Sequence, residues 1–170
     1  MVQSAVVEVD RPGVREDEAF ERLARREARR LFGIAYTILR DASEAEDVVQ
    51  EVMLRAWRAW HQTEGFADQE PWLTRICVNR CLSRRIRLRL RRTRETELGD
   101  GVSGSAAATA DPELACAFDR LSPKQRAVTL LHYYSGYSLD ECADLMGCRP
   151  GTARSHLHRA LTALREVMSQ

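Results

Sequence analysis

Apolar residues recur every three or four positions along most of the chain, a spacing that predicts helices rather than strands. Residues 16–40 form one such stretch, with a charged opposite side. Residues 41–60 form a second, in which Ser43 followed by Glu46 matches a capping box at the helix start. Runs of β-branched residues typical of strands are scarce, so we expect an all-α fold.

A third helix is predicted to start at Pro71 and to be strongly basic. Residues 72–94 hold nine arginines and no acidic residue. Such a surface suits a polyanion, although an isolated charge run is more often a solvated face. The first half of the stretch carries an apolar stripe, made of Leu73, Ile76, Cys77 and Cys81. The two cysteines are interpreted as small buried hydrophobes rather than zinc ligands.

Residues 95–113 are rich in glycine, alanine and serine, which is typical of a flexible linker. We therefore predict two small helical domains joined by this linker. The predicted parts are a flexible tail at 1–15, an N-terminal helical bundle at 16–94, the linker, and a helix-turn-helix domain at 114–170.

The C-terminal domain has the pattern of a helix-turn-helix. Ser138 with Glu141 caps a short helix, Gly147 marks a tight turn, and Pro150 opens a longer helix. This order of elements is the DNA-binding motif. Side chains of the types that bond base edges and phosphates crowd the start of the longer helix: Arg154, Ser155, His156, His158 and Arg159. DNA binding is thus favoured over a plain helical hairpin.

Composition and charge narrow the function further. The chain has 170 residues and a formal net charge of +1, so the basic stretch is offset elsewhere. No apolar run approaches the roughly 18 residues needed to span a membrane. Residues 1–15 lack the apolar core of a signal peptide, so we expect a cytoplasmic protein. No catalytic set, phosphate-cradling loop or metal cluster stands out, which predicts no enzyme activity, no cofactor and no metal.

One edge of the second helix is acidic. Residues 41–51 hold five acids and no base, and Asp47, Gln50, Glu51 and Leu54 lie roughly on one edge. This edge is either an ordinary wet face or a docking surface for a basic partner.

Three motifs, in this order, resemble the extracytoplasmic-function group of bacterial sigma factors in the sigma-70 family. They are DASEAEDVVQEVMLRAW, EPWLTRICVNRCLSRRIR, and the helix-turn-helix stretch that begins LSPKQRAVTLL. The resemblance covers roughly residues 18–168. It implies a non-catalytic subunit that binds core RNA polymerase, recognises the −10 and −35 promoter elements and promotes DNA opening. An anti-sigma protein is a further candidate partner, and the resemblance implies no membrane and no small-molecule substrate.

The resemblance also implies roles for individual residues. Those matching the contact to core polymerase are Asp47, Gln50, Glu51 and Met53. Those matching the −10 contacts are Phe66, Trp72, Arg75, Asn79, Arg80, Arg84 and Arg85. Those matching the −35 contacts are Thr152, Arg154, Ser155, His156, His158 and Arg159. Ser83 stands where the family commonly has an aspartate.

Two other functions are open at this point. A dimeric helix-turn-helix regulator would bind duplex DNA alone, with its N-terminal domain used for dimerisation or sensing. A helical adaptor without nucleic acid would show no salt-dependent affinity for DNA.

Overall fold

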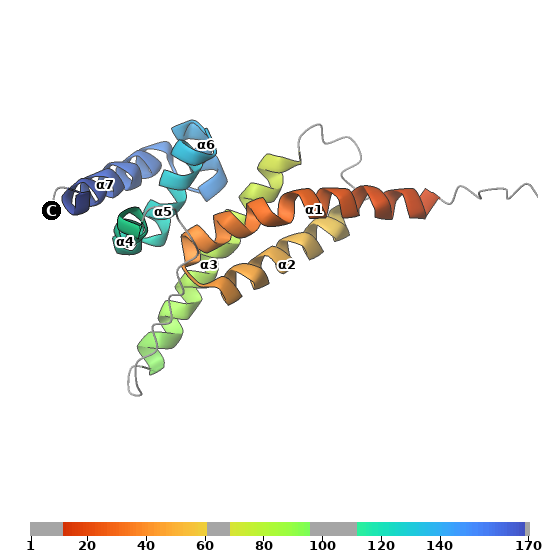
Figure 1. Ribbon diagram of the computed structural model, residues 1–170, viewed down its shortest axis with the longest axis horizontal. Helices are drawn as coiled ribbons and strands as arrows, with labels where there is room; N and C mark the ends of the chain where they lie inside the picture. Colours follow the sequence, from red (N-terminus) through yellow and green to blue (C-terminus); the bar gives the residue numbers. More distant parts are fainter. Residues whose placement is uncertain (1–11, 61–68, 96–111, 169–170) are drawn as a thin grey trace, which may run out of the picture.

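The computed structural model describes residues 12–60, 69–95 and 112–168, and all the regular structure in them is helical (Figure 1). The predicted all-α fold is therefore confirmed. The N-terminal helices are α1 (Pro12–Leu39), α2 (Ala42–Ala59) and α3 (Glu70–Glu95). The C-terminal elements are α4 (Pro112–Arg120), α5 (Pro123–Thr129), the π-helical turn η2 (Leu130–Tyr134), α6 (Leu139–Met146) and α7 (Pro150–Met168).

Helix α1 begins at Pro12, inside the stretch predicted to be a flexible tail. Proline suits a first helical turn because its missing N–H would have no partner there. Residues 1–11 and the predicted linker residues 96–111 lie outside the described part of the chain.

The turn between α1 and α2 differs from its prediction. Arg40 adopts a left-handed conformation with φ 58°, which ends α1 and leaves Asp41 extended. The Asp41 carboxylate accepts a hydrogen bond from the Glu44 N–H at 3.0 Å, so Asp41 is the N-cap of α2. The predicted capping box at Ser43 is wrong, because the chain is already helical at Ala42.

The predicted apolar stripes form the core of the N-terminal unit. Val48, Val52 and Ala56 of α2 are buried, as are Cys77 and Cys81 of α3. A hydrogen bond with Cys77 and burial raise the pKa of the Cys81 thiol well above its ordinary value. Both cysteines are therefore buried hydrophobes, as predicted, and Cys81 stays a neutral thiol.

The C-terminal unit contains the predicted helix-turn-helix. The predicted capping box of Ser138 with Glu141 is present, and a second one, Ser122 with Gln125, starts α5. Gly147 ends α6 with φ 63°, a left-handed conformation that is energetically unfavourable for any residue with a Cβ. Only three residues separate α6 from α7, so the tight turn between the two helices is confirmed.

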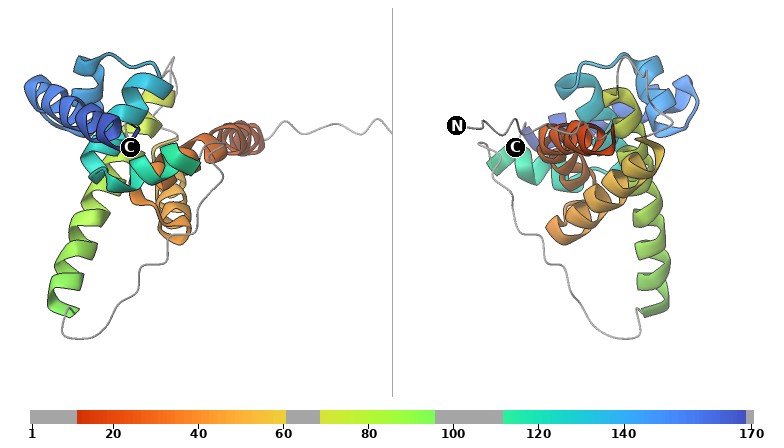
Figure 2. Two further views of the ribbon diagram at one scale, coloured as in Figure 1. Left: turned by 60° about the vertical axis from the view of Figure 1, so that its left-hand side comes forward. Right: turned by 90° about the vertical axis from the view of Figure 1, so that its right-hand side faces the viewer.

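The two units lie against each other and share one apolar core (Figure 2). Helix α5 packs on α1, and α6 packs on α3. Arg126, only 3% exposed, donates from Nε and Nη2 to the Ile38 carbonyl at 3.1 and 2.8 Å. The C-terminal half of α3 instead extends beyond the other helices (Figures 1 and 2). None of the described helices has the length and apolarity needed to cross a membrane.

Candidate nucleic-acid and polymerase interfaces

A groove of about 490 Å³ lies between α2 and α3. Its lining consists of Arg55 from α2 and of Trp72, Arg75, Ile76, Asn79, Arg80 and Ser83 from α3. The α3 residues follow one another at alternating spacings of three and one, which places them along one side of the helix. Four of the predicted −10 residues thus meet in one groove. Arg55, Ile76 and Ser83 were not predicted as part of it.

The chemistry of the groove suits an unpaired nucleotide. Arg55, Arg75 and Arg80 are cations, and no acidic side chain is among the lining residues. Trp72 offers a ring for stacking, and the amide of Asn79 offers both a donor and an acceptor. Arginine is suited to phosphate because its donors match the phosphate oxygens. The groove can therefore contact phosphate, base face and base edge.

Arg80 connects this groove to the acidic edge of α2. Its Nε atom is buried and has no hydrogen-bond partner among the described residues. That atom lies 3.6 Å from a Glu51 oxygen, which is an ion pair without hydrogen-bond geometry. Arg80 thus has one guanidinium N–H that forms no hydrogen bond with the described residues.

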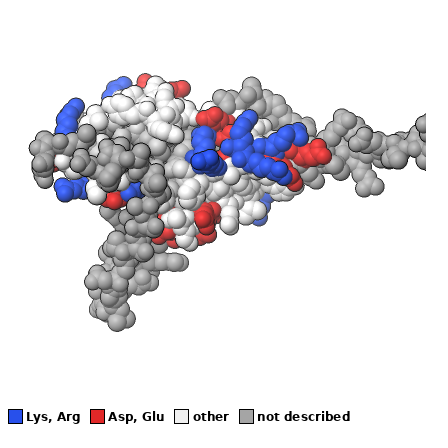
Figure 3. Space-filling model, viewed as in Figure 1, with Lys and Arg blue, Asp and Glu red and all other residues white. Residues whose placement is uncertain are grey.

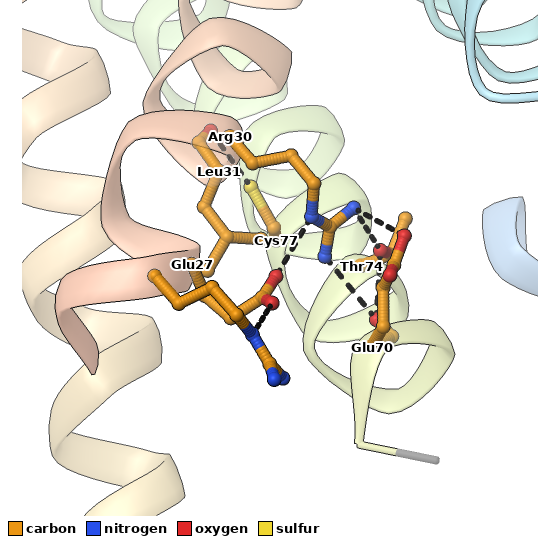
Figure 4. A network of polar contacts seen from close by, with 7 residues as sticks. Glu27, Arg30, Leu31, Glu70, Thr74 and Cys77 are labelled. Carbon is orange, nitrogen blue, oxygen red and sulfur yellow. Dashed lines mark hydrogen bonds and ion pairs between the residues drawn. The ribbon is translucent and has the colours of Figure 1, made fainter. Parts of the chain in front are cut away.

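A polar network fixes the start of α3, where the groove begins (Figure 4). The Arg30 guanidinium bonds buried Glu27 at 2.7 Å within α1 and donates to Thr74 of α3 at 3.0 Å. Arg30 also forms a 3.4 Å ion pair with Glu70. Burial raises the pKa of Glu27, but the hydrogen bonds and charges of Arg30 and Arg26 outweigh burial, so the pKa lies below its usual value. A charged Glu27 therefore orients the arginine that holds α3.

The acidic edge of α2, defined as Asp47, Gln50, Glu51 and Leu54, is open to solvent over most of its length. Asp47 and Gln50 are exposed, and the Leu54 side chain, unlike most large apolar residues here, is 56% exposed. Met53 was predicted as a docking residue, but its side chain packs against the core. Position 53 shares the side of α2 that carries the buried apolar stripe, whereas position 54 follows Gln50 by one turn.

Arg84 of α3 lies against this acidic edge of α2 and does not line the groove. Its Nη2 is 2.5 Å from Asp47 and its Nη1 is 2.9 Å from Glu51, while Nε bonds Glu44. Burial lowers the pKa of Arg84, but the hydrogen bond to Glu44 and the three carboxylate charges outweigh burial and raise it. Phe66 and the Arg85 side chain, also predicted −10 contacts, lie outside the described part of the structure.

Charge on another face of the protein is mixed. Figure 3 shows basic side chains gathered over α1 with acidic ones beside them. Arg22 and Arg25 on this helix are exposed and pair with Glu18 and Glu21 one turn earlier. These pairs are typical of a solvated helix surface.

Helix α7 presents the predicted DNA-binding face. Its apolar stripe of Ala153, Leu157 and Ala160 is buried against the unit. The predicted contacts Thr152, Arg154, Ser155, His158 and Arg159 are exposed, whereas His156 is half-buried. Burial, followed by the charges of Lys124 and Arg159, lowers the pKa of His156, so this imidazole is neutral at pH 7.

Within the described residues, no three His, Cys, Asp or Glu side chains come together in a way that would hold a metal ion. The absence of a metal from the whole protein stays a prediction.

Two family models match the chain. Sigma-70 region 2 matches residues 23–94, which contain the groove and the acidic edge. Sigma-70 region 4 matches residues 112–164, which contain the helix-turn-helix.

Curated relatives agree with these matches. The ECF RNA polymerase sigma factor SigM of Mycobacterium tuberculosis is 34% identical over 154 residues, which cover 88% of this chain and 77% of the relative. The RNA polymerase sigma-E factor of Streptomyces antibioticus is 32% identical over 157 residues, covering 88% of this chain and 84% of the relative.

Solved structures show the same fold. The sigma factor RpoE of Bartonella quintana, in complex with the anti-sigma factor NepR, superposes with a TM-score of 0.71 at 25% identity, covering 89% of this chain and 98% of that one. CnrH, in complex with the cytosolic domain of CnrY, superposes with a TM-score of 0.60 at 23% identity, covering 90% of this chain and 89% of that one.

Proposed function

The chain belongs to the extracytoplasmic-function group of the sigma-70 family, and from this membership we propose how its surfaces share the steps of transcription initiation. The acidic edge of α2 docks on core RNA polymerase through Asp47, Gln50, Glu51 and exposed Leu54. The groove between α2 and α3 holds unpaired DNA of the −10 element. The exposed face of α7 enters the major groove of the −35 element.

The groove is the observation that carries this proposal. Opened DNA differs from duplex DNA because its bases expose their faces and their pairing edges. The groove offers Trp72 for a base face, Asn79 for an edge and three arginines for phosphate. A regulator that reads only duplex DNA through α7 would not need such a groove on its other unit.

Two further parts of the proposal follow from this role. The protein has no catalytic activity of its own, because the polymerase supplies the chemistry of RNA synthesis, and it acts in the cytoplasm. An anti-sigma protein is a proposed partner, because the Bartonella relative is in complex with one.

The experiment separates docking from DNA opening with two variants. Asp47→Arg reverses a charge on the exposed acidic edge and should abolish binding to core polymerase, measured by fluorescence anisotropy. Arg75→Ala removes a groove cation and should leave core binding unchanged. It should reduce promoter opening by the holoenzyme about tenfold, measured by permanganate reactivity of unpaired thymines.

Arg22→Ala is the matched control for the loss of an arginine, because Arg22 is exposed on α1 and its ion pair is long at 3.9 Å. It should retain both activities. The proposal would be contradicted if Arg75→Ala left promoter opening at the wild-type level, or if Asp47→Arg still bound core polymerase normally.

A further inference from the structure

The Arg84 guanidinium bonds three carboxylates of α2 at once. Nη2 is 2.5 Å from Asp47, Nη1 is 2.9 Å from Glu51, and Nε bonds Glu44. The three acids follow one another at spacings of three and four residues, so they lie on consecutive turns along one side of α2. One arginine from α3 therefore holds two of the proposed docking residues together with a third acid.

This geometry argues against the DNA contact that the family resemblance implied for Arg84. All three nitrogens of the guanidinium are engaged by carboxylates, and the side chain is 24% exposed. A phosphate that approached Arg84 in this position would meet three negative charges. Arg75, which is exposed and lines a groove without acidic residues, is better placed to bind phosphate.

We propose that Arg84 is a positioning residue of the polymerase-docking surface, which holds Asp47 and Glu51 in the orientation that a basic partner binds. This inference rests on the proposed docking of α2 on core polymerase.

Arg84 can stay in place when polymerase binds. A carboxylate accepts several hydrogen bonds, and Asp47 keeps 53% of its side chain exposed while bonded to Arg84. Without Arg84, the three carboxylates would repel one another and their side chains would gain rotamer freedom. Docking would then have to order them again, which weakens binding.

Charge acts in the opposite direction, because loss of Arg84 makes the edge more negative and more attractive to a basic partner. Salt screens this attraction over about 8 Å at physiological ionic strength. A substitution that keeps the positive charge leaves this attraction unchanged, so any change in affinity then reports the loss of ordered side chains. Arg84→Lys retains one positive charge, but an ammonium group lacks the planar fork that reaches three carboxylates.

The test measures the affinity of core RNA polymerase from the source bacterium for the full-length protein. Arg84→Lys should bind about five- to tenfold more weakly than wild type, because ordered side chains are lost without a change in charge. Arg84→Gln, which lacks the charge, should also bind more weakly. Arg25→Lys makes the same change in an exposed 3.0 Å ion pair of α1 and should bind like wild type. Once assembled at saturating concentration, Arg84→Lys holoenzyme should bind promoter DNA with wild-type affinity.

Three results would overturn the inference: wild-type core affinity in Arg84→Lys, tighter core binding by Arg84→Gln, or normal core binding with weakened promoter binding. Tighter binding would make Arg84 a competitor of polymerase, and weakened promoter binding would make it a DNA contact. If wild type itself failed to bind core polymerase, the proposed function would fall together with the inference. Should Arg84→Lys fail to fold by circular dichroism, Glu44→Gln removes one partner at constant size and should weaken core binding; unchanged binding would count against the inference.

Discussion

A buried arginine joins the two helical units from inside the protein. Arg126 of α5 donates twice to the carbonyl of Ile38 and once to that of Phe118. Ile38 lies in the last turn of α1, whose carbonyls carry partial negative charge and lack helical partners. A buried charged group is tolerated only when its N–H donors find acceptors, and these two carbonyls accept three hydrogen bonds from Arg126. Arg126 therefore caps α1 and fixes α5 against it.

His156 gives the stability of the protein a dependence on pH. Burial and nearby cations lower its pKa in the folded protein, whereas the unfolded chain has the ordinary value of about 6.5. As the pH falls below about 6.5, the unfolded chain binds a proton at His156 more readily than the folded protein does. The contribution of neutral His156 to the free energy of unfolding is therefore fully present above that pH and is lost as the pH decreases towards the folded-state pKa. Denaturant unfolding at pH 7.5 and 5.5 should show a smaller loss of stability in His156→Gln than in wild type. Equal losses in the two proteins would disprove the assignment.

Single residues also show where sequence reasoning reaches its limit. The period of α2 correctly predicted its buried stripe, whereas the docking role of Met53, a half-buried residue that packs against the core, stays a prediction from the resemblance. Arg84 was grouped with the DNA contacts because the family resemblance implied it. Its three carboxylate partners come from another helix, and such a contact depends on how α2 and α3 cross, which the period of either helix does not specify.

At the scale of elements, helix ends were predicted where their signals are local. The capping box at Ser138 was predicted correctly because its side chain bonds a backbone group three residues away. The start of α2 was misplaced because Asp41 and Ser43 are both good N-caps. The left-handed Arg40, which decided between them, has no sequence signal comparable to glycine.

The N-cap of α2 is testable by mutation. Asp41→Ala removes the acceptor for the Glu44 N–H and should lower the free energy of unfolding by about 1 kcal/mol. Ser43→Ala is the matched control, because Ser43 is exposed within the first turn, and should change stability by less than about 0.5 kcal/mol. Urea unfolding measures both. A larger loss in Ser43→Ala would place the cap where the sequence predicted it.

At the scale of the whole molecule, two units were predicted but their contact was not. Composition predicted a linker at residues 95–113, although α3 extends to Glu95 and α4 begins at Pro112, and the motifs on either side were each recognisable. The contact depends on a buried Arg126 and on the turn after α6, where a Cβ at Gly147 would lie 3.5 Å from the Asn79 amide oxygen. The helix-turn-helix thus lies beside a residue of the proposed −10 groove.

This arrangement places the turn before α7 beside the groove, whereas a fully extended chain of the sixteen residues between α3 and α4 could reach about 55 Å. Two DNA elements separated by roughly two turns of duplex, at about 34 Å per turn, could not be bound by units in direct contact. Binding both elements together therefore requires Arg126 to leave the Ile38 carbonyl.

The most direct measurement is in vitro transcription with purified core polymerase and fragments of the source genome, followed by mapping of RNA 5′ ends. Adding the protein should create discrete start sites that core polymerase alone does not use. Upstream of these sites, shared sequences should lie near −10 and −35, and Asp47→Arg should abolish the starts. The proposed function would be contradicted if the protein left the 5′ ends unchanged and instead bound a duplex operator by itself as a dimer.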